Sequence, residues 1–204
     1  MDVTFFTGWI REIIRTLSVN RDRLTRLDAA IGDADHGTNL DRGFLAVRQQ
    51  LSDTPPTTPG QALTLVGGTL IRKVGGASGP LYGSAFRRLG RSFGDAPEVS
   101  LADLADGLTA AVQEVRRLGG AAEGDKTMVD ALAPAARELA QAVQEGEKAE
   151  EALERAARAA AEGARATIPL QARKGRASYL GPRSIGHEDP GAASAALIIA
   201  ALCP

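Results

Sequence analysis

The stretch VTFFTGWIREIIRTL, residues 3–17, decides the fold class of this chain. Its apolar residues recur every three or four positions, and Arg11, Glu12 and Arg15 fill the positions between them. This period is typical of an α-helix that buries one face and leaves the other in water. The segment therefore predicts an amphipathic opening helix.

The same period returns along the rest of the chain. Asn20 is predicted to cap a second short helix that passes through Leu24 and Leu27. Further helical segments are predicted at residues 44–51, 58–71, 81–94, 100–119, 129–143, 147–167 and 191–202. No segment alternates with a period of two, so no sheet is expected. The prediction is an all-α fold of about eight amphipathic helices.

The composition fits one domain, residues 1–204, and limits the possible partners. The net charge is −1, aromatic residues make up 4%, and basic residues are scattered, so no nucleic acid partner is expected. The longest apolar run, residues 192–203, is too short to span a bilayer, and the first residues lack the pattern of a secretion signal. The single Cys203 excludes an intrachain disulfide and a thiolate metal site. We expect a soluble, cytoplasmic protein.

Three aspartates cluster in LDAAIGDADHG, residues 27–37: Asp28, Asp33 and Asp35. Gly32 and Gly37 bracket the cluster and are expected to let the backbone turn, so that the three carboxylates converge. Carboxylates are hard ligands that suit Mg²⁺ or Mn²⁺, and such sites often leave positions open for phosphate. The alternative for an Asp-rich loop is a helix end with solvated acids.

Three other loops have an unusual composition. GGASGP, residues 75–80, precedes a predicted helix and is expected to expose N–H groups to an anion, although it lacks the Lys of a Walker motif. In GGAAEGDKTM, residues 119–128, Asp125 or Thr127 could instead be a plain helix cap. The basic, glycine-rich run 173–191 could bring an Arg to phosphate. The alternatives for the first and last are a tight turn and a solvated loop.

The chain has two histidines, His36 and His187. A lone histidine is ordinarily a surface or structural residue. His36 is the better functional candidate because it adjoins the aspartate cluster. Its expected role is a hydrogen bond to phosphate, since the carboxylates already supply the metal ligands.

Four ordered segments resemble the DhaL family, the nucleotide-binding subunit or domain of dihydroxyacetone kinases. They are GDADHGTN at 32–39, GGASGPL at 75–81, GDKTMVDAL at 124–132 and the run 173–191. The resemblance extends over nearly the whole chain. One departure is Ala34, where many members of the family have Gly. It is expected to leave the aspartates in place and to stiffen the loop.

The resemblance implies a single-domain barrel of eight amphipathic, antiparallel helices with the nucleotide at one end. Asp28, Asp33 and Asp35 would hold two Mg²⁺ ions on the nucleotide phosphates and act in catalysis through the metal, together with Arg176. The remaining positions match nucleotide contacts of the family. They are His36, Thr38, Asn39, Gly76, Ala77, Ser78, Gly79, Gly119, Gly120, Thr127, Met128, Arg176, Asp189, Pro190 and Gly191.

The family resemblance also implies a function. A phosphohistidine donor subunit of the phosphotransferase system would phosphorylate bound ADP to ATP. The phosphate would then pass to dihydroxyacetone on a separate kinase subunit and give dihydroxyacetone phosphate. The partners would be these two subunits, and a homodimer is possible. The alternatives are a subunit of an ATP-dependent kinase for dihydroxyacetone or a related hydroxy-ketone, and a nucleotide-loaded regulatory module without turnover.

Overall fold

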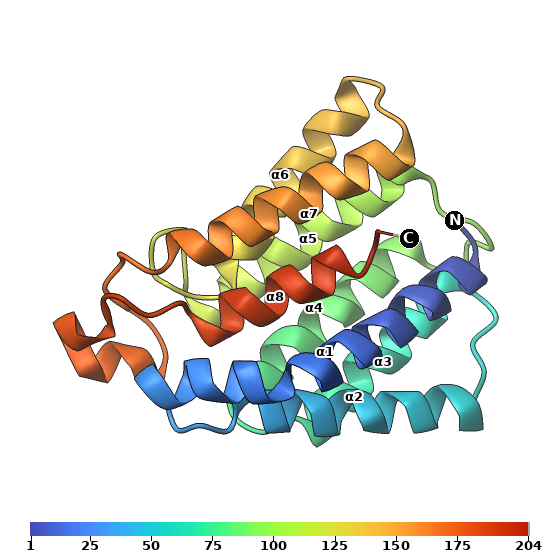
Figure 1. Cartoon of the computed structure of the whole chain (residues 1–204). Helices are drawn as coiled ribbons and strands as arrows, with labels where there is room; N and C mark the ends of the chain where they lie inside the picture. The colour runs from blue at the N-terminus through green and yellow to red at the C-terminus, as the bar shows by residue number, and fades with distance from the viewer. Residues whose placement is uncertain (204) are drawn as a thin grey trace.

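The computed structural model describes residues 1–203, which form eight α-helices and one 3-10 helix (Figure 1). The elements are α1 (Val3–Ile31), α2 (His36–Asp53), α3 (Pro59–Lys73), α4 (Ser78–Phe93), α5 (Leu101–Gly119), α6 (Val129–Gln144), α7 (Ala149–Ala166), η1 (Arg176–Ser184) and α8 (Pro190–Ala200). Among these residues there is no strand beyond one isolated bridge between Asp2 and Glu98. The predicted all-α fold class is confirmed.

The helices form a closed ring. Each helix packs against the next one along the chain, and α8 packs against both α7 and α1. Neighbours run antiparallel, so the loops that follow α1, α3, α5 and α7 gather at one end (Figure 1). Both termini lie toward the opposite end. No helix within residues 1–203 is both long and apolar enough to cross a membrane.

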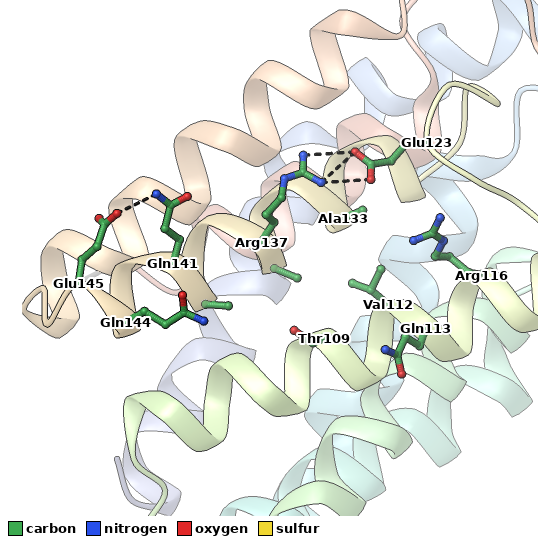
Figure 2. Close-up of a pocket in the computed structure, with 12 residues that line it drawn as sticks. Thr109, Val112, Gln113, Arg116, Glu123, Ala133, Arg137, Gln141, Gln144 and Glu145 are labelled. Atoms are coloured by element: carbon green, nitrogen blue, oxygen red, sulfur yellow. Dashed lines mark hydrogen bonds and ion pairs between the residues drawn. The ribbon is translucent and has the colours of Figure 1, made fainter.

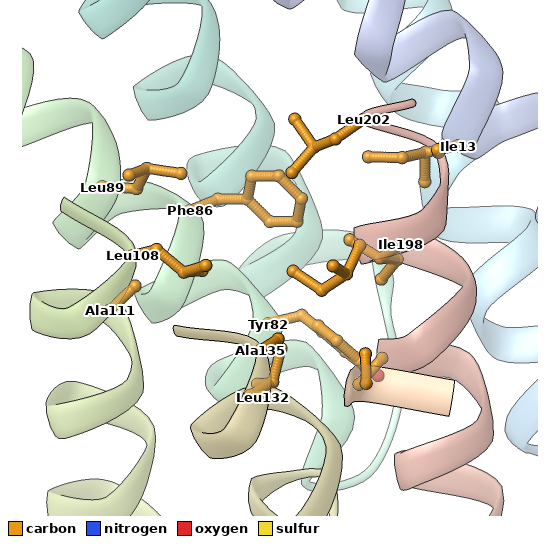
Figure 3. Packing of buried hydrophobic residues seen from close by; sticks show 14 of the residues in the cluster. Ile13, Tyr82, Phe86, Leu89, Leu108, Ala111, Leu132, Ala135, Ile198 and Leu202 are labelled. Atoms are coloured by element: carbon orange, nitrogen blue, oxygen red, sulfur yellow. The ribbon is translucent and has the colours of Figure 1, made fainter. Parts of the chain in front are cut away.

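Large side chains from several helices fill the interior of the ring (Figure 3). The Phe86 ring on α4 lies 5.7 Å from the Trp9 ring and 6.1 Å from the Phe44 ring, measured between centroids. Trp9 Nε1 donates to the carbonyl oxygen of Ile198 at 2.9 Å, which satisfies the buried indole and joins α1 to α8. Helix α8 is buried on nearly all sides, so it is apolar rather than amphipathic.

The predicted helix break at Asn20 is wrong, because α1 runs without interruption to Ile31. Asn20 Nδ2 donates to the carbonyl oxygen of Thr16 at 2.9 Å, a bond to the preceding turn that a helix interior accommodates. The predicted start at Thr58 is confirmed, since its hydroxyl accepts from Gln61 N–H at 3.2 Å. The 3-10 helix η1 lies in a segment that the sequence predicts only as irregular.

Candidate nucleotide and metal site

The structure brings the three aspartates together at the loop end of the ring. One carboxylate oxygen from each of Asp28, Asp33 and Asp35 lies within 4.8 Å of the other two. Asp28 is buried in the last turn of α1, whereas Asp33 and Asp35 are exposed in the linker to α2. Three negatively charged carboxylates at this spacing would repel one another in the absence of a cation. Their oxygens are ligands of the kind that Mg²⁺ prefers.

Asp28 also organises the loop that carries the other two carboxylates. Its Oδ2 accepts from the backbone N–H of Asp35 at 2.9 Å and from that of His36 at 3.1 Å. The Asp28 carboxylate therefore caps the start of α2 from the preceding helix. The N-cap residue Asp35 makes no side-chain cap bond of its own. Gly32 is required here, since a Cβ at this position would overlap the Asp28 carboxylate.

Gly37 and Ala34 shape the loop differently from the sequence prediction. Gly37 does not turn the backbone, because it lies inside α2. A Cβ on Gly37 would overlap Arg21 and Thr25, so its absence lets α2 approach α1 closely. Ala34 instead takes the left-handed conformation, with φ of 62°. This costs a residue with a Cβ about 1 kcal/mol, which explains why glycine suits the position.

Arg176 reaches the aspartate cluster from a distant part of the sequence. Its Nε lies 3.0 Å from Asp33 Oδ2, and 69% of its side chain is exposed. An ion pair this exposed adds little to stability. The guanidinium is therefore held beside the carboxylates but remains free to contact an anionic ligand.

His36 is buried between two hydroxyl groups. Its Nε2 lies 2.8 Å from Ser194 Oγ on α8, and its Nδ1 lies 3.2 Å from Ser78 Oγ at the start of α4. Burial lowers the pKa of the His36 imidazole, and the carboxylates of Asp28 and Asp35 oppose this effect. A neutral imidazole offers one donor and one acceptor, which matches two hydroxyl partners.

Tyr82 and Ser194 extend this arrangement into the core. Tyr82 donates to the carbonyl oxygen of Gly191 at 3.1 Å, and its hydroxyl oxygen lies 2.6 Å from Ser194 Oγ. Burial raises the pKa of the Tyr82 phenol, so it stays protonated. Neither residue could be predicted from the sequence, because Tyr82 lies on the apolar face of an amphipathic helix and Ser194 lies in an apolar helix. Nothing in the local pattern marks a polar role at either position.

The glycine-rich loop before α4 lies beside the start of α2. Gly76 has a left-handed φ of 63°, and the N-cap residue Ala77 makes no side-chain hydrogen bond. The first N–H groups of α4 therefore have no side-chain cap from Ala77. Asn39 is buried against this loop, where a Cβ on Gly75 would lie 3.2 Å from Asn39 Nδ2.

The loop after α5 combines capping with an approach to α8. Thr127 Oγ1 accepts from Val129 N–H at 3.1 Å, but the N-cap of α6 is Met128, so neither Asp125 nor Thr127 is the N-cap residue. Asp130, which the sequence analysis did not assign, accepts from Thr127 N–H at 2.7 Å. A Cβ on Gly191 would lie 3.5 Å from the backbone nitrogen of Met128, so the starts of α6 and α8 are adjacent.

The remaining predicted positions surround these loops. Gly119 ends α5, and Gly120 follows it with a left-handed φ of 57°. Thr38 is exposed in the first turn of α2, and Gly79 is buried in the first turn of α4. Pro190 opens α8 behind its N-cap Asp189, whose Oδ2 accepts from Ala192 N–H at 2.7 Å.

Asp189 should make stability depend on pH. Burial raises its pKa to about 7, Asp130 adds to this, and the Ala192 N–H and Lys126 oppose it. The native state therefore holds a proton that the unfolded chain releases near pH 3.9. As pH rises from about 4 to about 7, the contribution of this group should destabilise the native state by on the order of a few kcal/mol.

The comparison with Asp189→Asn isolates that effect. The amide cannot ionise, so the wild-type free energy of unfolding, measured by urea titration, should fall relative to that of the variant across this pH window. A difference that stays constant from pH 4 to pH 7 would contradict the assignment.

A separate groove of about 650 Å³ lies between α5 and α6 (Figure 2). Its floor includes Val112 and Ala133, and Arg137 at its rim pairs with Glu123 at 3.2 Å. None of the three aspartates lines this groove. The candidate metal site is instead the open loop end of the ring.

Residues 30–204 match the DAK2 domain family. The chain belongs to the DAK2 domain family. The match covers most of the chain, including all four loops at that end of the ring. This match and the relatives described next confirm the resemblance to the DhaL family.

Several relatives match this chain over most of their length. The chain is 40% identical over 191 residues to "PEP-dependent dihydroxyacetone kinase, ADP-binding subunit DhaL" of Escherichia coli K12, covering 94% of this chain and 91% of the relative. It is 40% identical over 201 residues to subunit DhaL of kinase 2 of Listeria innocua, covering 98% and 93%. A D-erythrulose kinase of Mycolicibacterium smegmatis is 40% identical over 178 residues, but the match covers only 31% of that protein.

Two solved structures match this chain over part of a longer chain. The native dihydroxyacetone kinase of C. freundii matches with a TM-score of 0.75 and 26% identity, over 98% of this chain and 34% of that one. The same kinase in complex with AMP-PNP and Mg²⁺ matches with a TM-score of 0.72 and 28% identity. The chain thus spans about a third of the length of these kinases.

Proposed function

We propose that residues 1–204 act as one nucleotide-binding domain, the ADP- and Mg²⁺-binding subunit of a dihydroxyacetone kinase. The observation that carries this proposal is the cluster of Asp28, Asp33 and Asp35 beside Arg176, at the end where four loops meet. Support also comes from the DhaL subunits of which this chain covers 91% and 93%. The phosphate would travel from a phosphohistidine donor, through bound ADP, to dihydroxyacetone on a separate subunit.

The residues at the loop end divide the work of phosphoryl transfer. The three aspartates would hold Mg²⁺, which when bound neutralises charge on the nucleotide phosphates. Arg176 would place its guanidinium on the transferred group, where negative charge must be balanced. Ser78 would present its hydroxyl group from the start of α4. His36 would hold that hydroxyl in place, since its Nδ1 lies 3.2 Å from Ser78 Oγ and its Nε2 lies 2.8 Å from Ser194 Oγ.

The face around Arg176 suits a protein partner. Tyr179 lies on the same 3-10 helix and is 88% exposed, and Ile185 just beyond it is 46% exposed. Exposed aromatic residues next to an arginine are common at protein interfaces. Both the donor and the acceptor subunit would need to reach the terminal phosphate, and an open face allows this.

The direct test is reconstitution. The purified chain with Mg²⁺, ATP and dihydroxyacetone should form no measurable dihydroxyacetone phosphate, because the site that we assign accounts for phosphates and metal, whereas dihydroxyacetone would sit on the separate subunit. Adding a dihydroxyacetone-binding kinase subunit and a phosphohistidine donor should give product. Turnover by the chain alone would contradict the proposal. Failure of the complete system with ADP still bound would favour the regulatory module.

A second candidate is a subunit that exchanges free ATP, for dihydroxyacetone or a related hydroxy-ketone. The observation that favours it is the 40% identity to a D-erythrulose kinase. The relay requires ADP to stay bound between transfers, whereas an ATP-consuming kinase must release it each cycle.

Nucleotide retention separates these two candidates. We expect protein loaded with labelled ADP to keep its label for many minutes in excess unlabelled ADP or ATP with Mg²⁺, because many simultaneous contacts mainly slow dissociation. The label should become ATP only after a phosphohistidine donor is added. Loss of label within seconds would favour the ATP-exchanging kinase.

A further inference from the structure

Lys126 is a buried lysine in the loop before α6. Only 1% of it is exposed, and its ammonium nitrogen points into a shell of backbone carbonyl oxygens. The oxygens and their distances from Nζ are Thr167 at 2.8 Å, Ser184 at 2.8 Å, Leu170 at 3.1 Å, Ile168 at 3.5 Å and His187 at 2.5 Å. An ammonium has three N–H donors, so the five oxygens surround it by charge–dipole attraction as well as by direct hydrogen bonds.

Two unfavourable energy terms, a buried charge and a strained backbone, indicate that Lys126 has a specific role at this position. A buried ammonium is unfavourable unless it is fully hydrogen-bonded. The backbone at Lys126 is also left-handed, with φ of 63°, although the residue has a Cβ. Strained conformations of this kind persist where the surroundings over-determine them, and they cluster at functional sites.

The carbonyl oxygens all come from the segment 167–187, which joins α7 to α8. Nζ binds the carbonyl oxygens of Thr167 and Leu170 at the start of this segment and those of Ser184 and His187 at its end. Most of η1 lies between these two pairs of contacts. Arg176 lies on η1, where it pairs with Asp33. The ammonium therefore binds both ends of the segment that carries Arg176.

Lys126 also belongs to the opposite side of the site. It directly precedes Thr127 and Met128. The Asp130 carboxylate stabilises this loop, because it accepts hydrogen bonds from the N–H groups of Gly124 and Thr127. One further bond, from Arg173 N–H to the carbonyl oxygen of Asp125 at 3.0 Å, joins the same two loops. Lys126 thus connects the loop before α6 with the loop that carries Arg176.

We propose that Lys126 is a positioning residue, whose ammonium orders the segment 167–187 so that Arg176 faces the aspartate cluster. Lys126 does not touch the nucleotide in this role and acts through Arg176. The consequence for phosphoryl transfer rests on the proposed function, whereas the ordering of the segment does not.

The first test measures order without nucleotide. Lys126→Met keeps the length of the side chain and removes the ammonium. In the full chain, amide hydrogen exchange across residues 168–188 should speed up by about tenfold or more, since several charge-assisted hydrogen bonds are lost. Protection of α1 and α5 should stay unchanged. The matched control is Lys148→Met, which removes an exposed ammonium at the start of α7 and should leave exchange in 168–188 as in the wild type.

The second test asks whether Lys126 acts through Arg176. Calorimetry with Mg²⁺ and ADP should show about tenfold weaker binding for Lys126→Met, the size of one charge-assisted contact. In the Arg176→Ala background the same change should have little further effect, because its target is already gone. Additive losses, or unchanged exchange in 168–188, would overturn the proposal.

Lys126→Gln guards against a variant that fails to fold. Its amide can donate to two of the carbonyl oxygens, so an intermediate exchange rate is expected. Unfolding of both variants would also overturn the positioning role, because Lys126 would then serve the whole fold. If wild-type protein transfers no phosphate in the complete system, the proposed function fails, while the exchange result still decides the role of Lys126.

Discussion

Asp33→Asn and Asp35→Asn are each expected to weaken Mg²⁺-dependent ADP binding by about 100-fold or more. Each change removes one charged oxygen from the three that lie within 4.8 Å of one another. Changes to groups that merely orient a metal ligand already cost about 10- to 100-fold in affinity, so loss of a ligand should cost at least as much. Calorimetric titration of the purified variants with ADP, with and without Mg²⁺, measures the effect.

The fold should survive these two changes. Asp33 and Asp35 are exposed, and removing one of three like charges relieves repulsion in the metal-free protein. Asp28 is unsuitable for this test, because its carboxylate also caps α2. Asp106→Asn, at an exposed position on α5, is the matched control and should bind normally. Unchanged Mg²⁺–ADP affinity in both site variants would rule out the assigned metal ligands.

Arg176→Ala is expected to lower phosphoryl transfer by about 1000-fold, within the range for arginines that balance charge on a transferred phosphoryl group. Arg176 Nε lies 3.0 Å from Asp33 Oδ2, so the guanidinium is positioned beside the cluster without a bound ligand. ADP binding should weaken far less, by about tenfold, because the arginine contributes most when charge develops during transfer. Rates with the complete set of subunits, compared with calorimetric ADP affinities, separate the two effects.

Two further variants sharpen that experiment. Arg176→Lys should recover only part of the rate, since a lysine cannot reproduce the planar fork of donors. Arg183→Ala removes an exposed arginine at the far end of η1 and should transfer phosphate like the wild type. A transfer rate in Arg176→Ala within about threefold of the wild type would mean that Arg176 is not part of the catalytic machinery.

Local signals allowed much of the fold to be predicted. Thr58-Pro59 and Ser100 begin helices as predicted, because a cap depends on residues within one turn. Asn20 has the same capping chemistry, yet it lies inside α1. The local sequence could not distinguish a cap from an interior residue there, since packing of the whole helix against the core decides between them.

The candidate site divides in the same way. Asp33 and Asp35 lie close to Asp28 in the sequence, so their convergence could be predicted from the loop alone. Arg176 and Asp33 belong to distant segments. The family resemblance assigned both to one site, but their pairing was not predicted. Lys126 could not be assigned a role, because its partners are backbone carbonyl oxygens, which leave no mark in the pattern of side chains.

The position of the two termini has a consequence for how such a domain can be built into larger proteins. Both ends of the described chain lie away from the four loops (Figure 1). A neighbouring domain joined at either end would therefore leave the loop end open. The same fold can then serve as an independent subunit or as one part of a longer kinase. In the C. freundii kinase, the matching part makes up about a third of the chain. For the same reason, an affinity tag or a surface tether at either terminus should present the loop end to solution.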